Sequence, residues 1–167
     1  MGLILNQSLK KLTKGYPTRT AKEQVEGGIV ASTSANILPG NVICFTSTAG
    51  EFTATFDATK IAGIALATNV KLVTEYPGES KDAPFCPGEA INLMISGYIA
   101  MELDSSLYTV AADGTVTFDA SIVEGAAATT DGEKITAVGA QTGFNAVFTG
   151  VVEYNNGKGL AEIKYNM

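Results

Sequence analysis

The pattern of apolar and polar positions from about Val25 onward predicts short β-strands separated by tight turns. In residues 51–56, apolar side chains alternate with threonines, which is the two-residue period of a strand with one buried face. Residues 61–68 are almost continuously apolar and predict a strand buried on both faces. Further strands are predicted at residues 27–32, 42–46, 90–95, 98–103, 107–111, 115–118, 134–138, 146–154 and 159–165.

Turn residues separate these strands at close spacing. Asp113-Gly114 is typical of a hairpin turn, and the Asn-Asn-Gly-Lys tetrapeptide at residues 155–158 predicts a second hairpin. Gly97 interrupts an apolar run, which indicates a bulge or a sharp bend rather than one long strand. Residues 76–83 contain Pro-Gly and mixed charge and are predicted to form a surface loop. The fold class is therefore all-β, either a β-barrel or a β-sandwich of short antiparallel strands.

The first 24 residues differ in composition from the rest, so we predict a basic N-terminal arm, 1–24, on a single β domain, 25–167. Residues 1–22 carry five positive charges and no negative ones, whereas the remainder carries six positive and 17 negative charges. One interpretation is a frayed, solvated terminus. The other is an arm that docks on an acidic surface of a neighbouring copy or of another protein. The conformation is left open between a short helix and the extended chain that Pro17 favours at Tyr16.

Composition limits the partners of the β domain. The net charge of −6 argues against nucleic acid and anionic membranes as partners. No stretch approaches the roughly 20 apolar residues of a membrane span, and no secretory signal is expected. We therefore expect the protein to be synthesised in a cytoplasm. Charged residues make up only 17% of the chain, which is typical of a protein with surfaces that a partner covers.

Residues that could carry chemistry are few. The chain has no His, so a Ser-His-Asp or Cys-His arrangement is impossible, and no nucleotide-binding motif is present. Cys44 and Cys86 lie in unrelated contexts and are predicted to be small buried hydrophobes, with a disulfide between them left open. We therefore predict a non-enzymatic protein with no cofactor and no metal site.

The acidic residues offer two weaker candidates. Glu79, Asp82 and Glu89 lie in loops where carboxylates could hold a cation, although a solvated loop is the favoured interpretation. Glu102 and Asp104 flank one strand residue and could form the carboxylate pair of a polysaccharide hydrolase. Their alternation with apolar residues favours solvent-facing positions instead.

The order of features over roughly residues 15–105 resembles the capsid decoration, or structural cement, proteins of tailed bacteriophages. The segments that carry this resemblance are Gly15-Tyr16-Pro17, Glu26–Val30, Lys60–Ala65 and the turn, strand, Gly, strand pattern of Pro87–Ile99. The resemblance implies a β-barrel or β-sandwich on an icosahedral shell, a trimer, and an N-terminal arm that crosses capsomer boundaries. Residues 106–167 lie beyond it and are interpreted as an elaboration at the exposed end.

The leading hypothesis is a virion protein that binds the outer capsid surface, with the major capsid protein as its partner, and reinforces the shell. The arm residues predicted to form the interface are Lys10, Lys11, Lys14, Tyr16, Pro17, Arg19 and Lys22. The alternative is a receptor- or glycan-binding β module of a fibre or adhesin, for which the arm is dispensable. The absence of Trp platforms weighs against that alternative.

Overall fold

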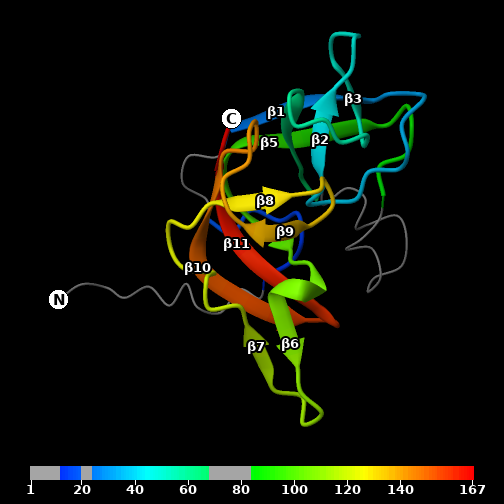
Figure 1. Cartoon of the computed structure of the whole chain (residues 1–167). Coiled ribbons are helices and arrows are strands. Elements are labelled where there is room, and N and C mark those ends of the chain that lie inside the picture. The colour runs from blue at the N-terminus through cyan, green and yellow to red at the C-terminus, as the bar shows by residue number, and fades with distance from the viewer. Residues whose placement is uncertain (1–11, 20–23, 68–83) are drawn as a thin grey trace, which may run out of the picture.

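The computed structural model describes residues 12–19, 24–67 and 84–167, which form eleven β-strands and, within those ranges, no α-helix. One 3₁₀ turn, η3, spans Ser105–Leu107. The strands are β1 (Gln24–Val30), β2 (Val42–Phe45), β3 (Glu51–Thr53), β4 (Ile61–Ala65), β5 (Ala90–Glu102), β6 (Tyr108–Val110), β7 (Val116–Phe118), β8 (Ala128–Thr130), β9 (Ile135–Val138), β10 (Ala146–Asn155) and β11 (Lys158–Asn166). The predicted all-β class is confirmed (Figure 1).

Five of these strands close into a small barrel. The hydrogen-bonded order is β1-β3-β2-β4-β5, and β5 pairs back onto β1. All neighbours are antiparallel except β1 and β3, which run parallel through Ile29↔Glu51 and Val30↔Phe52. Closure leaves no free edge in this part of the sheet. The barrel interior is filled by Val30, Ile37, Ile43, Phe52, Ala62, Ala65, Phe85, Ile91 and Leu93.

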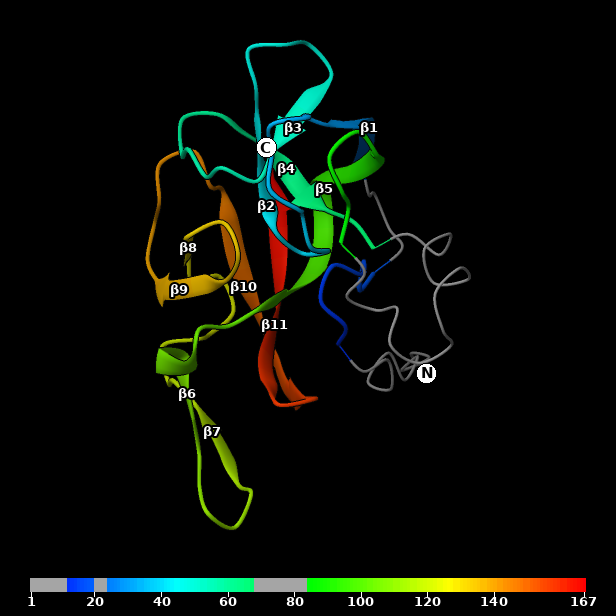
Figure 2. The same ribbon diagram turned by 90° about the vertical axis from the view of Figure 1, so that its right-hand side faces the viewer.

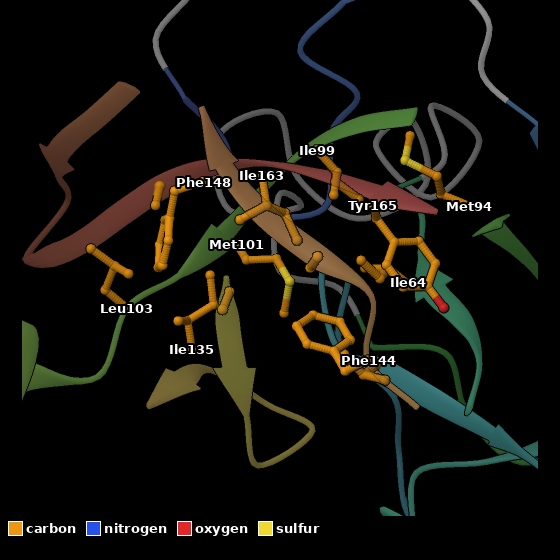
Figure 3. Close-up of a cluster of buried hydrophobic side chains, with 14 of the residues drawn as sticks. Ile64, Met94, Ile99, Met101, Leu103, Ile135, Phe144, Phe148, Ile163 and Tyr165 are labelled. Carbon is orange, nitrogen blue, oxygen red and sulfur yellow. The ribbon is translucent and has the colours of Figure 1, made fainter. Parts of the chain in front are cut away.

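A second and larger core lies beside the barrel. The later half of β5 continues the sheet through β11 to β10, and the β8–β9 hairpin covers one face of this extension. The covering hairpin is joined to the sheet by the bridges Leu103↔Ile135 and Ala127↔Val147. Figure 3 shows the side chains that meet in this core: Ile64, Met94, Ile99, Met101, Leu103, Ile135, Phe144, Phe148, Ile163 and Tyr165.

Strand β5 belongs to both cores. Its first half pairs with β1 and β4, and its second half pairs with β11 from Ser96 to Glu102. β5 continues through Gly97, which pairs with Tyr165, so the prediction of two separate strands is wrong. The predicted irregularity is present, because the register with β1 shifts beside Gly97, where Gln24 pairs with Ser96 and Val25 pairs with Met94. Gly97 has φ 146°, a conformation that side chains with a Cβ rarely adopt. The glycine thus allows β5 to curve from one core to the other while it keeps its partners (Figure 2).

Local turn chemistry gave the most accurate expectations. The C-terminal hairpin is confirmed: Asn155 pairs with Lys158 across Asn156 and Gly157, which have φ values of 52° and 79°. The hairpin around Asp113-Gly114 is confirmed as β6–β7. Strand β8 was not predicted. The predicted loop at residues 76–83 lies outside the described residues.

Candidate functional site

Residues 12–19 are part of the folded sheet. The N–H of Gly15 donates to the carbonyl of Ala100 (2.9 Å), and the N–H of Ala100 donates to the carbonyl of Tyr16 (3.3 Å). Further along, the N–H of Thr18 donates to the carbonyl of Tyr98 (3.0 Å). Pro17 forms an antiparallel bridge with Ile99. The segment is therefore a short extra strand along β5, on the side of the β5–β11 sheet away from β8 and β9 (Figure 2).

The start of this segment folds over the outer face of the same sheet. Leu12 is buried against Ala100 and Leu160 in a small apolar cluster of its own. The backbone N–H of Leu12 donates to Oε2 of Glu153 on β10 (2.6 Å). Apolar packing and a charged acceptor together fix the point at which the chain reaches the sheet.

Glu102 at the end of β5 is buried beneath three lysines. Its carboxylate lies 3.6 Å from Nζ of Lys14, 3.2 Å from Nζ of Lys134 and 3.1 Å from Nζ of Lys158. Burial by itself raises the pKa of Glu102, but the charge of Lys14 and the hydrogen bonds from Lys158 and Lys134 outweigh it and lower the pKa below its ordinary value. The carboxylate therefore stays ionised and binds the N-terminal segment to β9 and β11.

A second buried carboxylate fixes the other end of the segment. Nε of Arg19 donates to Oε1 of Glu162 (2.8 Å), and its Nη2 donates to Oε2 (3.2 Å). The guanidinium also lies over the Tyr98 ring, 4.4 Å from its centroid. The bidentate hydrogen bond to Glu162 raises the pKa of Arg19.

These contacts gather most of the described positive charge on one face. Of the six lysine and arginine residues within the described ranges, four take part in these contacts: Lys14, Arg19, Lys134 and Lys158. A fifth, Lys164, lies two residues after Glu162 on β11 and so projects from the same side of the strand. We call these five residues the basic face. The sixth, Lys60, pairs with Asp57 between β3 and β4. The carboxylates of Glu102, Glu153 and Glu162 lie on the basic face. Hydrogen bonds to Glu162 and Glu102 raise the pKa values of Arg19 and Lys134, and the charges of Glu124 and Asp104 help to raise them further. The cations of the basic face are therefore interleaved with carboxylates.

The basic face also contains a small recess. It has a volume of about 80 Å³ and lies between the N-terminal segment and the turn from β10 to β11. The residues that line it are Leu12, Thr13, Lys14, Asn155, Asn156, Lys158 and Leu160. Ammonium and amide groups beside a small apolar floor can receive one acidic side chain of a partner.

A family model for structural cement proteins, described by the members E217 gp24 and Pam3 gp6, matches residues 5–166. The chain belongs to the phage structural cement protein family. The role of this cement protein is structural, in association with a phage capsid. No curated protein matches the chain.

The seven arm residues predicted for this cement protein fall into two groups. Lys10, Lys11 and Lys22 lie outside the described residues. Lys14, Tyr16, Pro17 and Arg19 lie in the segment that pairs with β5. Lys14 is buried and Arg19 is half-buried, each against a carboxylate of the same chain, while Tyr16 and Pro17 are half-buried. Their part in binding the capsid stays a prediction.

Sequence reasoning predicted only Lys14 and Arg19 among the residues of the basic face, and it considered Glu102 only as part of a carboxylate pair. Glu102 and Glu162 each lie between apolar neighbours on a strand, which is also the pattern of a solvent-facing residue. Lys134 and Lys158 follow turns, where lysine is common. The presence of two acids on apolar strands was a weak signal, but the partners that cover them are far away in the sequence: Lys14 is 88 residues from Glu102, and Arg19 is 143 residues from Glu162.

The other chemical candidates of this cement protein are the acidic loop residues, the two cysteines and Asp104; of the acidic loop residues, Glu79 and Asp82 lie outside the described residues. In the described ranges, no three His, Cys, Asp or Glu residues come together as metal ligands, and no helix there has the length and apolar character to cross a membrane. Cys44 is a buried free thiol. Cys86 is an exposed free thiol, so its predicted burial is wrong. The Asp104 carboxylate accepts a hydrogen bond from the N–H of Ser106 at the start of η3, while Glu102 binds lysines.

The bond between Arg19 and Glu162 is expected to protect residues 12–19 from cleavage by trypsin after Lys14. In an Arg19→Gln variant the buried Glu162 loses its bidentate partner, so the pairing of residues 15–18 with β5 weakens. We expect the fragment that begins at Gly15 to appear several-fold faster than from the unmodified protein, as followed by mass spectrometry. Lys164→Gln, a lost charge on the same face of β11, is the matched control. Equal cleavage rates in all three proteins would contradict this role for Arg19.

Proposed function

We propose that this cement protein binds the outer surface of an icosahedral phage capsid through its N-terminal arm and the basic face, with the major capsid protein as its partner. The observation that supports this most strongly is the gathering of five of the six described cations around residues 12–19 in an otherwise acidic chain. An acidic surface on the shell is the complementary partner. In this proposal Lys14 and Arg19 are positioning residues, which direct the arm from a fixed point on the body.

The recess supports a mode of contact in which a single acidic side chain of the capsid protein enters beside Lys14 and Lys158. Its volume of about 80 Å³ is well below the roughly 300 Å³ of the smallest ligand sites. It therefore suits a side chain better than a sugar, and no observation favours the glycan-binding alternative.

Repetition on the shell explains how modest contacts would reinforce it. Each identical site adds the same binding free energy, and copies held at neighbouring sites gain further from a high effective concentration. We propose that the protein is made in the host cytoplasm, associates as trimers and adds to the assembled shell at the capsid surface.

Truncation of the arm tests the proposal, provided that the sheet is left intact. Deletion of residues 2–24 would also remove the strand on β5 and leave Glu102 and Glu162 without Lys14 and Arg19. Deletion of residues 2–11 alone avoids this. We expect it to weaken binding to purified shells at least tenfold, measured by co-sedimentation. Binding as tight as that of the full chain would overturn docking through the arm.

Charge reversal separates electrostatic contact from loss of chain length. The double variant Lys10→Glu/Lys11→Glu is expected to bind the shell roughly tenfold more weakly at low salt, with the difference shrinking at high salt. Lys60→Glu is the control, because Lys60 lies away from the basic face. An affinity that does not depend on salt in any of the proteins would count against an acidic partner surface.

A further inference from the structure

The β6–β7 hairpin is a separate two-stranded ribbon that projects from the body (Figure 1). It is paired only within itself, through Tyr108↔Phe118, Thr109↔Thr117 and Val110↔Val116. A lone two-stranded hairpin is marginally stable in water, so its position depends on contacts at its base. Its outer part, from Thr109 to Thr117, is exposed except for Val116, which is half-buried.

Aromatic packing fixes the direction of this ribbon. The Tyr108 ring lies 6.0 Å from the Phe118 ring and 5.6 Å from the Tyr154 ring of β10, measured between centroids. Gly159 on β11 makes room for it, since a Cβ there would lie 2.5 Å from the Tyr108 ring. The ribbon is therefore presented to a partner in one orientation, which reduces the entropy lost on binding.

The outer part of the ribbon has an apolar face and almost no charge. Side chains alternate along a strand, so Val110 and Val116 share one face with the aromatic base, and Thr109 and Thr117 share the other. Val110 is 47% exposed. Asp113 is the one ionisable residue between Tyr108 and Phe118, and its carboxylate accepts the N–H of Thr115 in the turn. Lys and Pro, which commonly protect free strands from pairing, are absent from this hairpin.

The direction of the ribbon relative to the basic face indicates the partner. Figure 2 shows residues 12–19 on one side of the β5–β11 sheet, whereas β6 and β7 extend away from the body along the direction of β11. If the basic face sits on the shell, as the proposed function requires, the ribbon runs along the shell surface toward the neighbouring site. Copies with a net charge of −6 repel one another, and a ribbon with Asp113 as its one ionisable residue between Tyr108 and Phe118 is where they can approach most closely.

We propose that the β6–β7 hairpin is the contact between neighbouring trimers on the shell, in which the Val110–Val116 face of one copy packs against the same face of a copy in the next trimer. This inference rests on the proposed function for the orientation of the protein on the shell. The apolar area of two valines is well below that of a standard interface, so association in solution is weak and becomes extensive only when the shell holds the copies side by side.

Sedimentation of the full chain from micromolar to millimolar concentration tests the contact. We expect the average mass to rise reversibly with concentration. Val110→Lys/Val116→Lys is expected to show no such rise in average mass. Thr109→Lys/Thr117→Lys adds the same charges to the opposite face and is expected to associate like the unmodified chain. Thermal melting should be unchanged in both variants, since these side chains project from the folded body. An average mass of the unmodified chain that does not rise with concentration, or equal behaviour of the two variants, would overturn the proposal.

Crosslinking gives an independent measurement of the same contact. In a Cys86→Ser background, which removes the exposed thiol, Val110→Cys is expected to form covalent dimers under mild oxidation at high concentration. Thr109→Cys, on the other face, is expected to stay largely uncrosslinked, and equal yields would contradict the proposed packing.

The tests of the hairpin contact are independent of arm truncation. Shell binding that is unaffected by loss of residues 2–11 refutes docking through the arm, whereas association that is unaffected by V110K/V116K refutes the hairpin contact.

Discussion

Replacement of Gly143 by alanine is expected to destabilise the fold by about 3 kcal/mol or more. Gly143 lies in the connection from β9 to β10 with φ 80°, and a Cβ added there would overlap the backbone carbonyl of Ala58. The neighbour is backbone rather than a flexible side chain, so the β3–β4 loop or the β9–β10 connection has to move. Phe144, the next residue, is buried in the larger core and would move with it. Urea denaturation followed by circular dichroism gives the change in unfolding free energy.

Gly114 provides the matched control for this substitution. It has φ 84°, almost the same as Gly143, but a Cβ there meets no atom within 4 Å. Gly114→Ala is therefore expected to cost about 1 kcal/mol, the conformational penalty alone. The difference between the two variants measures the close approach to Ala58. If both substitutions cost the same, the contact between the two loops contributes nothing to stability.

Glu102→Gln is expected to destabilise the protein by about 2 kcal/mol at neutral pH. The substitution keeps the shape of the side chain but leaves Lys14, Lys134 and Lys158 close together without their carboxylate. Lys14 is the costliest of the three, because its side chain is only 9% exposed and cannot easily turn to water. Lys134 and Lys158 are partly exposed, so the loss is smaller than for a fully buried cluster. Glu133→Gln, a neutralised exposed carboxylate on the β8–β9 hairpin, is the control.

The pH dependence of stability provides a second measurement on the same variant. The folded-state pKa of Glu102 is lowered, so its contribution is fully present above the pKa of the unfolded chain and is lost as the pH falls through the folded-state pKa. The difference between the unmodified protein and Glu102→Gln is therefore expected to be constant near neutrality and to shrink progressively as acid protonates the carboxylate. A difference that does not change with pH would mean that the lysines do not stabilise the charged form.

The elements predicted correctly from the sequence are those that short-range chemistry determines. The Asn-Asn-Gly-Lys turn at residues 155–158 needs two adjacent residues with positive φ, and the side chains on either side alternate. The Asp113-Gly114 turn likewise predicted the hairpin that it closes, β6–β7. Strand β8 was missed because three residues, Ala-Thr-Thr, are too few to show a period.

The features that were not predicted depend on residues that lie far apart in the sequence. Barrel closure requires β1 to pair with both β3 and β5, and nothing within β1 specifies either partner. Glu162 has the local pattern of an exposed strand residue, yet the segment around Arg19 covers it. Gly97 looked like a strand break because the sequence cannot show that β11 pairs continuously on both sides of it.

The attachment of the N-terminal segment joins the two ends of the chain and so affects when the protein can finish folding. Leu12 binds Glu153 and Arg19 binds Glu162, partners that are 141 and 143 residues away. Contacts of such long sequence separation form slowly, and here they cannot form until the ribosome has released β10 and β11. Residues 12–19 are synthesised early but must wait until β10 and β11 have been made. Translation of the C-terminal hairpin therefore sets the moment at which the basic face is assembled.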